Sequence, residues 1–173
     1  MNPDVVECLT QSKQQMLSAV GGAAEDHAGA SPAEGSWSIV QCLEHVSMVE
    51  AHFLRALRTA TRQDAPLLDR AREEQLSVRL VDRSTKVRAP ERAEPKGKIT
   101  SVSDGVRAFE TTRDQMIDFA KARADDLDYF RVPHPMFGEV SGTLLLRILA
   151  GHAARHADQI REIRARLEAD GSR

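Results

Sequence analysis

The chain has 173 residues, which is long enough for one domain with a sizeable hydrophobic core and no disulfide staples. Hydrophobic residues make up 41% and charged residues 29%, so the composition indicates neither general disorder nor a membrane span. Lys and Arg number 24 against 26 Asp and Glu, and the formal net charge of −2 gives no overall attraction to nucleic acid. We expect no nucleic-acid partner and no membrane association.

The two cysteines and the N-terminal residues bear on the location of the protein. Cys8 and Cys42 lack the spacing of a zinc motif, and the first residues do not combine a basic start with an apolar stretch. We therefore expect a reducing, cytoplasmic environment. No internal repeat is visible, so residues 1–173 are interpreted as a single domain.

Two amphipathic helices are predicted in the first sixty residues. Apolar residues recur at helical spacing from about residue 3 to the low twenties, with Asn2 as the expected N-cap and Gly21 able to end the helix. Ser38 and Gln41 have the form of a capping box at the start of a second helix. The apolar spacing predicts that this helix continues to about residue 60.

A long crossover is expected between the second and third helices. Residues 61–99 contain many charges, three prolines and Gly97, and only residues 67–80 have enough apolar content for one short helix. Such a long connection is unusual in a compact domain, so we expect it to pack over the core and border a site. Ser101 and the following acidic residue predict the start of the third helix.

The last part of the chain predicts a turn-rich connection and a fourth helix. Residues 125–142 contain two prolines and two glycines, and they include no convincing strand. A helix is expected from Ser141 or Thr143 to about Ala169, with an apolar arc of roughly 120°. These elements predict an all-α fold, a four-helix bundle with a long crossover between the second and third helices.

Two histidines lie at the centre of this apolar arc. His152 and His156 are four residues apart, so their rings lie about 40° apart around the helix and one turn apart along it. Buried imidazoles need partners, and a zinc, nickel, iron or copper ion would satisfy both. The alternative is a pair of core histidines bonded to carboxylates or backbone carbonyls. No glutamate follows the first histidine, so the pair is not the H-E-x-x-H protease motif.

Five further residues are candidates for the same site. His45 is the candidate third ligand, although the pattern alone places it on the flank of the second helix's apolar stripe. Cys42 lies one turn before it and is interpreted as a small core residue, with a thiolate ligand as the alternative. Gln159 could orient a ligand ring. His134 could reach the site from a loop, and His52 is interpreted as a solvated histidine that could border the pocket.

Three motifs in the chain resemble those of DinB-like proteins, the DinB/YfiT superfamily. Residues 37–45 resemble its W-S-x-x-x-x-x-x-H opening, residues 134–138 its H-P-x-x-G turn, and residues 152–160 its H-x-x-R-H-x-x-Q-I helix. Their order and spacing agree with the family from about Trp37 to Ile163.

The resemblance implies a four-helix bundle in which His45, His152 and His156 bind one divalent metal ion. Nickel, zinc, iron or manganese would be compatible, with water or substrate completing the coordination sphere. Characterised relatives include transferases and isomerases that use low-molecular-weight thiols, and others are described as metal-dependent hydrolases. Family members are often homodimers, so a homodimer is expected.

The leading hypothesis is a metal-dependent enzyme acting on a small-molecule substrate, either a thiol-dependent S-transferase or isomerase, or a hydrolase. A site with three protein ligands keeps a position open, as catalytic zinc sites do. The second hypothesis is a non-catalytic, stress-related protein that binds a metal or small molecule. A third is a structural bundle whose core histidines bind no metal.

Overall fold

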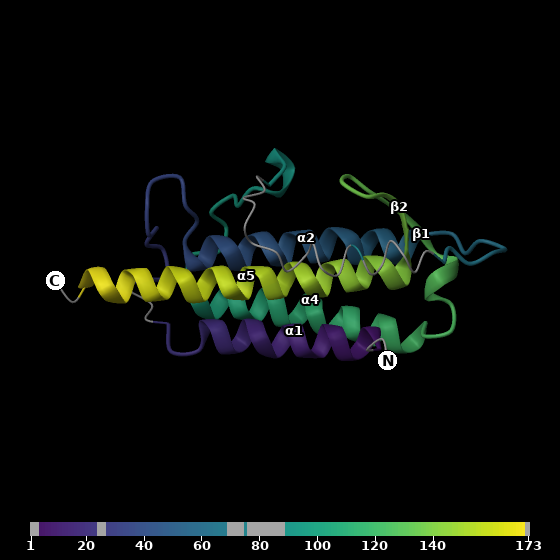
Figure 1. The fold of residues 1–173 in the computed structure, drawn as a ribbon, viewed down its shortest axis with the longest axis horizontal. Coiled ribbons are helices and arrows are strands. Elements are labelled where there is room, and N and C mark those ends of the chain that lie inside the picture. Colours follow the sequence, from purple (N-terminus) through teal and green to yellow (C-terminus); the bar gives the residue numbers. More distant parts are fainter. Residues whose placement is uncertain (1–3, 24–26, 69–74, 76–88, 172–173) are drawn as a thin grey trace.

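Four long helices form a bundle in the computed structural model, which describes residues 4–23, 27–68, 75 and 89–171. Their bounds are α1 (Val5–Val20), α2 (Ile39–Thr59), α4 (Val102–Ala122) and α5 (Gly142–Gly171). Helix α1 packs mainly against α5, and α2 mainly against α4, while α1/α4 and α2/α5 contacts close the bundle (Figure 1). The predicted four-helix, mainly α-helical fold is therefore confirmed.

Local capping interactions explain where the helices begin. At the start of α2, Ser38 N–H donates to Gln41 Oε1 at 2.8 Å, and Gln41 N–H donates to Ser38 Oγ at 3.3 Å, as the capping box predicts. Ser101 Oγ accepts from Asp104 N–H at 3.1 Å at the start of α4. The N-cap of α1 is Asp4, and the expected cap at Asn2 lies outside the described residues.

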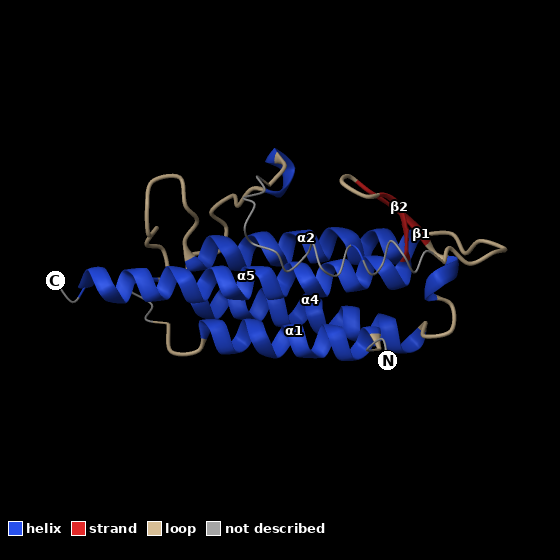
Figure 2. Ribbon diagram, viewed as in Figure 1, coloured by secondary structure: helices blue, strands red, loops and turns tan. Residues whose placement is uncertain are grey.

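A short β-hairpin precedes α5, so the expectation of a connection without strands is wrong. Strands β1 (Arg131–His134) and β2 (Gly138–Ser141) pair in antiparallel register (Figure 2). Val132 pairs with Val140, and both are buried at 1% or less exposure. The apolar signal is confined to these two residues in four-residue strands, which is too little for the sequence pattern to reveal.

The crossover between α2 and α4 is described for residues 61–68, 75 and 89–99. A short 3-10 helix, η2 (Glu91–Ala93), lies in it, and the residues after η2 hydrogen bond to α2. The helix expected within residues 67–80 lies almost entirely outside the described residues. The described part packs against the bundle, as expected for a long connection.

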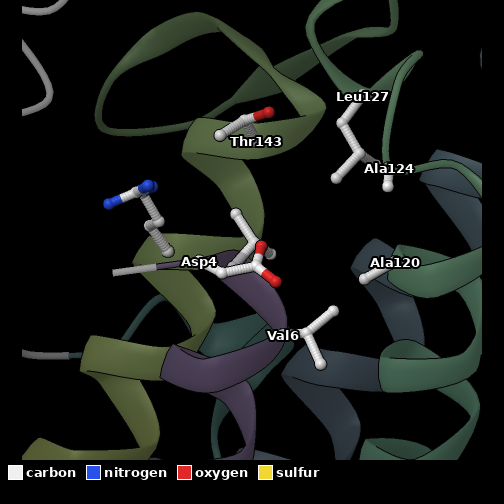
Figure 3. Close-up of a pocket in the computed structure, with 8 residues that line it drawn as sticks. Asp4, Val6, Ala120, Ala124, Leu127 and Thr143 are labelled. Carbon is white, nitrogen blue, oxygen red and sulfur yellow. The ribbon is translucent and has the colours of Figure 1, made fainter. Parts of the chain in front are cut away.

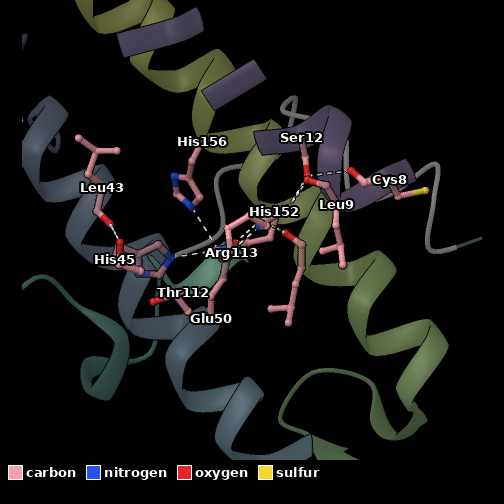
Figure 4. Close-up of polar contacts among 12 residues, drawn as sticks. Cys8, Leu9, Ser12, Leu43, His45, Glu50, Thr112, Arg113, His152 and His156 are labelled. Carbon is pink, nitrogen blue, oxygen red and sulfur yellow. Dashed lines mark hydrogen bonds and ion pairs between the residues drawn. The ribbon is translucent and has the colours of Figure 1, made fainter. Parts of the chain in front are cut away.

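A buried ion pair crosses the middle of the bundle between two apolar clusters. Arg113 of α4 and Glu50 of α2 both have side chains with 0% exposure. The guanidinium donates to both Glu50 oxygens, to Leu9 O at 3.1 Å and to Ser12 Oγ at 2.5 Å on α1. Arg113 therefore links α4 to α2 and α1 within the core (Figure 4).

Replacing Arg113 by Met should lower the free energy of unfolding by about 3–5 kcal/mol, because Glu50 would remain buried without its charge partner. Urea denaturation followed by far-ultraviolet circular dichroism measures this change. The matched control is Arg107→Met on the same helix, where an exposed ion pair with Asp104 should contribute less than about 1 kcal/mol. Equal losses in the two variants would contradict a stabilising role for the buried pair.

Candidate metal centre

His45 lies in the first half of α2 and is only 4% exposed. Its Nδ1 is 2.6 Å from the carbonyl oxygen of Ala93, at the end of η2. The helical pattern placed His45 on the flank of the apolar stripe because the pattern contains no information about the crossover. The segment that carries Ala93 contacts this flank, and burial of His45 follows from that contact.

His152 and His156 lie one turn apart on α5, and their Nε2 atoms are 3.2 Å apart. His156 is 8% exposed, and its Nδ1 is 2.9 Å from Gln159 Oε1. Ala153 and Ala157, beside the histidines, are fully buried against the other helices. The apolar arc of α5 therefore carries both imidazoles into the bundle, where partners for their nitrogens are required.

The three imidazoles meet at their Nε2 atoms. His152 Nε2 is 3.0 Å from His45 Nε2 and 3.2 Å from His156 Nε2, and the three possible donor atoms lie within 4.8 Å of one another (Figure 4). Two imidazole nitrogens bound to one tetrahedral zinc ion at about 2.0–2.1 Å are separated by about 3.3 Å. The separations of His152 Nε2 from the Nε2 atoms of His45 and His156 are close to that value, and all three pairs lie within 4.8 Å.

The hydrogen bonds at the opposite ring atoms assign the tautomers. A carbonyl oxygen only accepts, so neutral His45 carries its proton on Nδ1 and presents a lone pair at Nε2. The Gln159 Oε1 contact assigns the same tautomer to His156. A single N–H at Nε2 of His152 cannot donate well to the Nε2 lone pairs of both His45 and His156. In addition, His152 Nδ1 is buried without a hydrogen-bond partner. A cation would satisfy three lone pairs together, so these residues fit a divalent metal ion.

The surroundings keep two of the rings neutral. Burial lowers the pKa of His45 below its ordinary value. Burial also holds the pKa of His152 well below its usual range, with further lowering by His156, His45 and the Arg113 guanidinium. Neutral imidazole is the form that binds metals, so both rings are prepared for coordination near neutral pH.

Trp37 lies against two of the three histidines. Its ring centroid is 4.8 Å from that of His45, and it stacks on His156 at 6.0 Å with an interplanar angle of 17°. Trp37 was part of the first motif above, but sequence reasoning did not propose it as a site residue. The available signal was its position immediately before the capping box of α2, because the start of that helix places Trp37 close to His45.

Three of the candidate residues are not members of the nitrogen cluster. His134 stacks between Phe53 and Phe137, with ring centroids 5.2 and 4.7 Å away, and Phe53 is eight residues or about 12 Å along α2 from His45. His52 is exposed, and its ring contacts Phe53. Cys42 is fully buried in the apolar core. Gln159 is the additional candidate that hydrogen bonds to a histidine of the cluster, His156.

A cavity of about 170 Å³ lies beside the first turns of α1 and α5, and Asp4, Ala120, Leu127 and Thr143 are among its lining residues (Figure 3). A second cavity, also about 170 Å³, lies near Arg164 on α5. None of the three clustered histidines lines either cavity. The imidazole cluster is therefore identified by the chemistry of its side chains.

A family model described as the DinB superfamily matches residues 9–160, a span that contains all three clustered histidines. The chain belongs to the DinB superfamily. The match confirms the family resemblance of the sequence motifs. Among the residues that the structure describes, no helix of this DinB-superfamily protein is both long and apolar enough to cross a membrane.

Similar proteins extend over nearly the whole chain. The uncharacterized protein YuaE of Bacillus subtilis strain 168 is 27% identical over 161 residues, covering 92% of this chain and 97% of YuaE. The crystal structure of TT2238, a four-helix bundle protein, has a TM-score of 0.59 and 22% identity, covering 91% and 96% of the two chains. YfiT from Bacillus subtilis has a TM-score of 0.61 and 13% identity, covering 95% and 86%.

The solved structure of YfiT is described as a probable metal-dependent hydrolase with an unusual four-helix bundle topology. At 13% and 22% identity, YfiT and TT2238 show that the present DinB-superfamily chain shares their fold. This likeness shows the fold alone and assigns no function to the present site.

The lowered pKa values of His45 and His152 predict that the metal-free protein loses stability in mild acid. Above about pH 6.5 both rings are neutral in the folded and unfolded chain, whereas below it the unfolded chain takes up protons first. Each histidine that is protonated in the unfolded chain but neutral in the folded chain lowers the free energy of unfolding by up to about 1.4 kcal/mol for every unit by which the pH falls.

Urea denaturation in the presence of a chelator, at pH values between about 7.5 and 5.5, measures this loss. His152→Ala should flatten the dependence on pH, whereas His52→Ala, at an exposed position, should leave it unchanged. A constant unfolding free energy across this range in the unsubstituted protein would contradict the prediction.

Proposed function

We propose that this protein is a metal-dependent enzyme in which His45, His152 and His156 hold one divalent cation. The proposal rests on the close approach of three Nε2 atoms. His152 Nε2 lies 3.0 Å from His45 Nε2 and 3.2 Å from His156 Nε2. Three protein ligands leave coordination positions for water or substrate, which is the arrangement of catalytic zinc sites. The donor set is compatible with zinc, nickel and iron, and manganese is compatible on the family resemblance.

A divalent ion at this position would lower the pKa of a bound water or thiol and provide a nucleophile near neutral pH. The protein residues hold the imidazoles for that task. Ala93 O and Gln159 Oε1 retain the Nδ1 protons of His45 and His156, and the Trp37 ring covers one side of these two rings. The chain thus supplies fixed, neutral nitrogen donors.

The proposed reaction is hydrolysis of a small molecule, or transfer or isomerisation with a low-molecular-weight thiol as the co-reactant. The description of YfiT as a probable metal-dependent hydrolase supports the first version. The resemblance to thiol-dependent members of the family supports the second. We also propose a cytoplasmic homodimer of this single domain, in keeping with the family resemblance.

A metal-binding or small-molecule-binding protein without catalysis, of the kind involved in stress responses, is the second candidate function. It is favoured by one observation: neither of the two cavities described above is lined by the clustered histidines. Storage or sensing of a metal requires three good donors but no substrate cavity beside them.

The metal content of the purified protein tests the site. The unsubstituted chain, purified without added metal, should contain about one equivalent of a divalent metal by elemental analysis. His152→Ala/His156→Ala should lose it, because two of the three donors are removed. His52→Ala is the matched control and should retain the metal, since His52 is exposed outside the cluster. Equal metal content in the double variant and the control would refute the assignment.

Turnover separates the enzyme from the binding protein. The metal-loaded chain would be assayed for hydrolysis of small esters and amides, and for conjugation of low-molecular-weight thiols with electrophiles. We expect turnover that His45→Ala lowers by at least about 100-fold and His52→Ala leaves unchanged. Tight binding of a thiol or substrate analogue without turnover would support the second candidate function instead.

A further inference from the structure

Glu44, immediately before His45, is a carboxylate buried at 2% exposure. It has no cationic partner among the ion pairs of the described residues. Instead, backbone N–H groups of the crossover donate to its oxygens: Lys96 and Lys98 to Oε1 at 3.0 and 3.1 Å, and Gly97 to Oε2 at 3.0 Å. Both carboxylate oxygens are therefore occupied by consecutive backbone donors.

The backbone N–H groups of residues 96–98 form a cradle around the Glu44 carboxylate, and Gly97 allows the crossover to adopt this shape. Its φ of +71° lies in the left-handed region, and a left-handed residue in a turn lets successive N–H groups point to one anion. A Cβ at Gly97 would meet no atom within 4 Å, so the backbone angle and not crowding requires glycine. The cradle and the carboxylate are thus matched in shape and charge.

The same short segment carries the carbonyl group that orients His45. Ala93 O accepts from His45 Nδ1 at 2.6 Å, only three residues before the first N–H bonded to Glu44. Lys96 Nζ also donates to Glu91 O at 3.0 Å, which closes the turn between the two contacts. Consecutive residues of α2 therefore hold the crossover at two adjacent points.

We propose that Glu44 is a positioning residue for the metal centre, an inference that rests on the proposed function. By fixing residues 96–98, Glu44 holds Ala93 O against His45 Nδ1. This contact keeps the proton of His45 on Nδ1 and the lone pair of Nε2 towards the other two histidines. Hydrogen-bond partners of this kind on the far ring nitrogen typically change metal affinity by about 10–100-fold.

The substitution Glu44→Gln tests this role at nearly constant shape. The amide has one oxygen acceptor in place of two, so its NH₂ group would face at least one of the three backbone donors. Glu91→Gln is the matched control, because it removes the same charge from an exposed side chain of the same crossover. Circular dichroism should give the same helix content for both variants.

The first measurement uses the metal-free full-length protein. Two-bond ¹H–¹⁵N correlation spectra of the histidine rings report which nitrogen of His45 carries the proton. The unsubstituted chain and Glu91→Gln should show the Nδ1–H tautomer, whereas Glu44→Gln should show a mixture of tautomers. A role in fold stability alone would leave the tautomer unchanged.

The second measurement is the affinity for zinc ions, determined by competition with a chelator. Glu44→Gln should bind zinc about 10–100-fold more weakly than the unsubstituted chain, with Glu91→Gln within about twofold of it. A Glu44→Gln protein with the Nδ1–H tautomer and the zinc affinity of the control would overturn the proposal.

A second variant covers the outcome in which Glu44→Gln does not fold. Gly97→Ala strains the cradle from the other side and leaves Glu44 and His45 in place, so it should shift the tautomer of His45 in the same direction. An unchanged tautomer in that variant would overturn the proposal. If the unsubstituted chain binds no zinc or other metal, the proposed function fails, and the tautomer measurement still decides whether Glu44 positions His45.

Discussion

The requirement that buried polar groups be paired governs the middle of this bundle. Arg113 satisfies it by bonding to Glu50 on α2 and to the backbone and Ser12 of α1, with Leu149 O of α5 at 3.5 Å. These contacts fix how far the helices are displaced along one another. Glu50 lies five residues after His45 on α2, and Leu149 lies three residues before His152 on α5. The alignment of helices that pairs Arg113 therefore also brings the His45 and His152 rings to the same height along the bundle.

The sequence predicted those features that depend on local or periodic patterns. Ser38 and Gln41 marked the start of α2 because a capping box involves only four residues, and helical spacing placed His152 and His156 on the inner face of α5. The burial of His45 could not be predicted from spacing, because the covering residue, Ala93, is 48 positions away in the chain.

Charged residues inside the bundle were the other features that pattern reasoning missed. Glu50 and Arg113 interrupt the apolar stripes of α2 and α4, whereas Glu44 lies almost opposite the apolar stripe of α2, on the face that the pattern assigns to solvent. Each is buried because a partner distant in sequence satisfies it: a backbone cradle for Glu44, and a mutual ion pair for Glu50 and Arg113. Family motifs could identify His45 without any of this information, because they record positions and not environments.

The position of Trp37 gives the protein an optical property. It is the single tryptophan of the chain, and its ring lies 4.8 Å from the His45 ring and stacks on His156. The tryptophan fluorescence of the folded chain therefore originates beside the three imidazoles. Protonation of these rings, or a paramagnetic ion such as nickel bound between them, would quench this emission, so the protein reports the state of its own site without an added label.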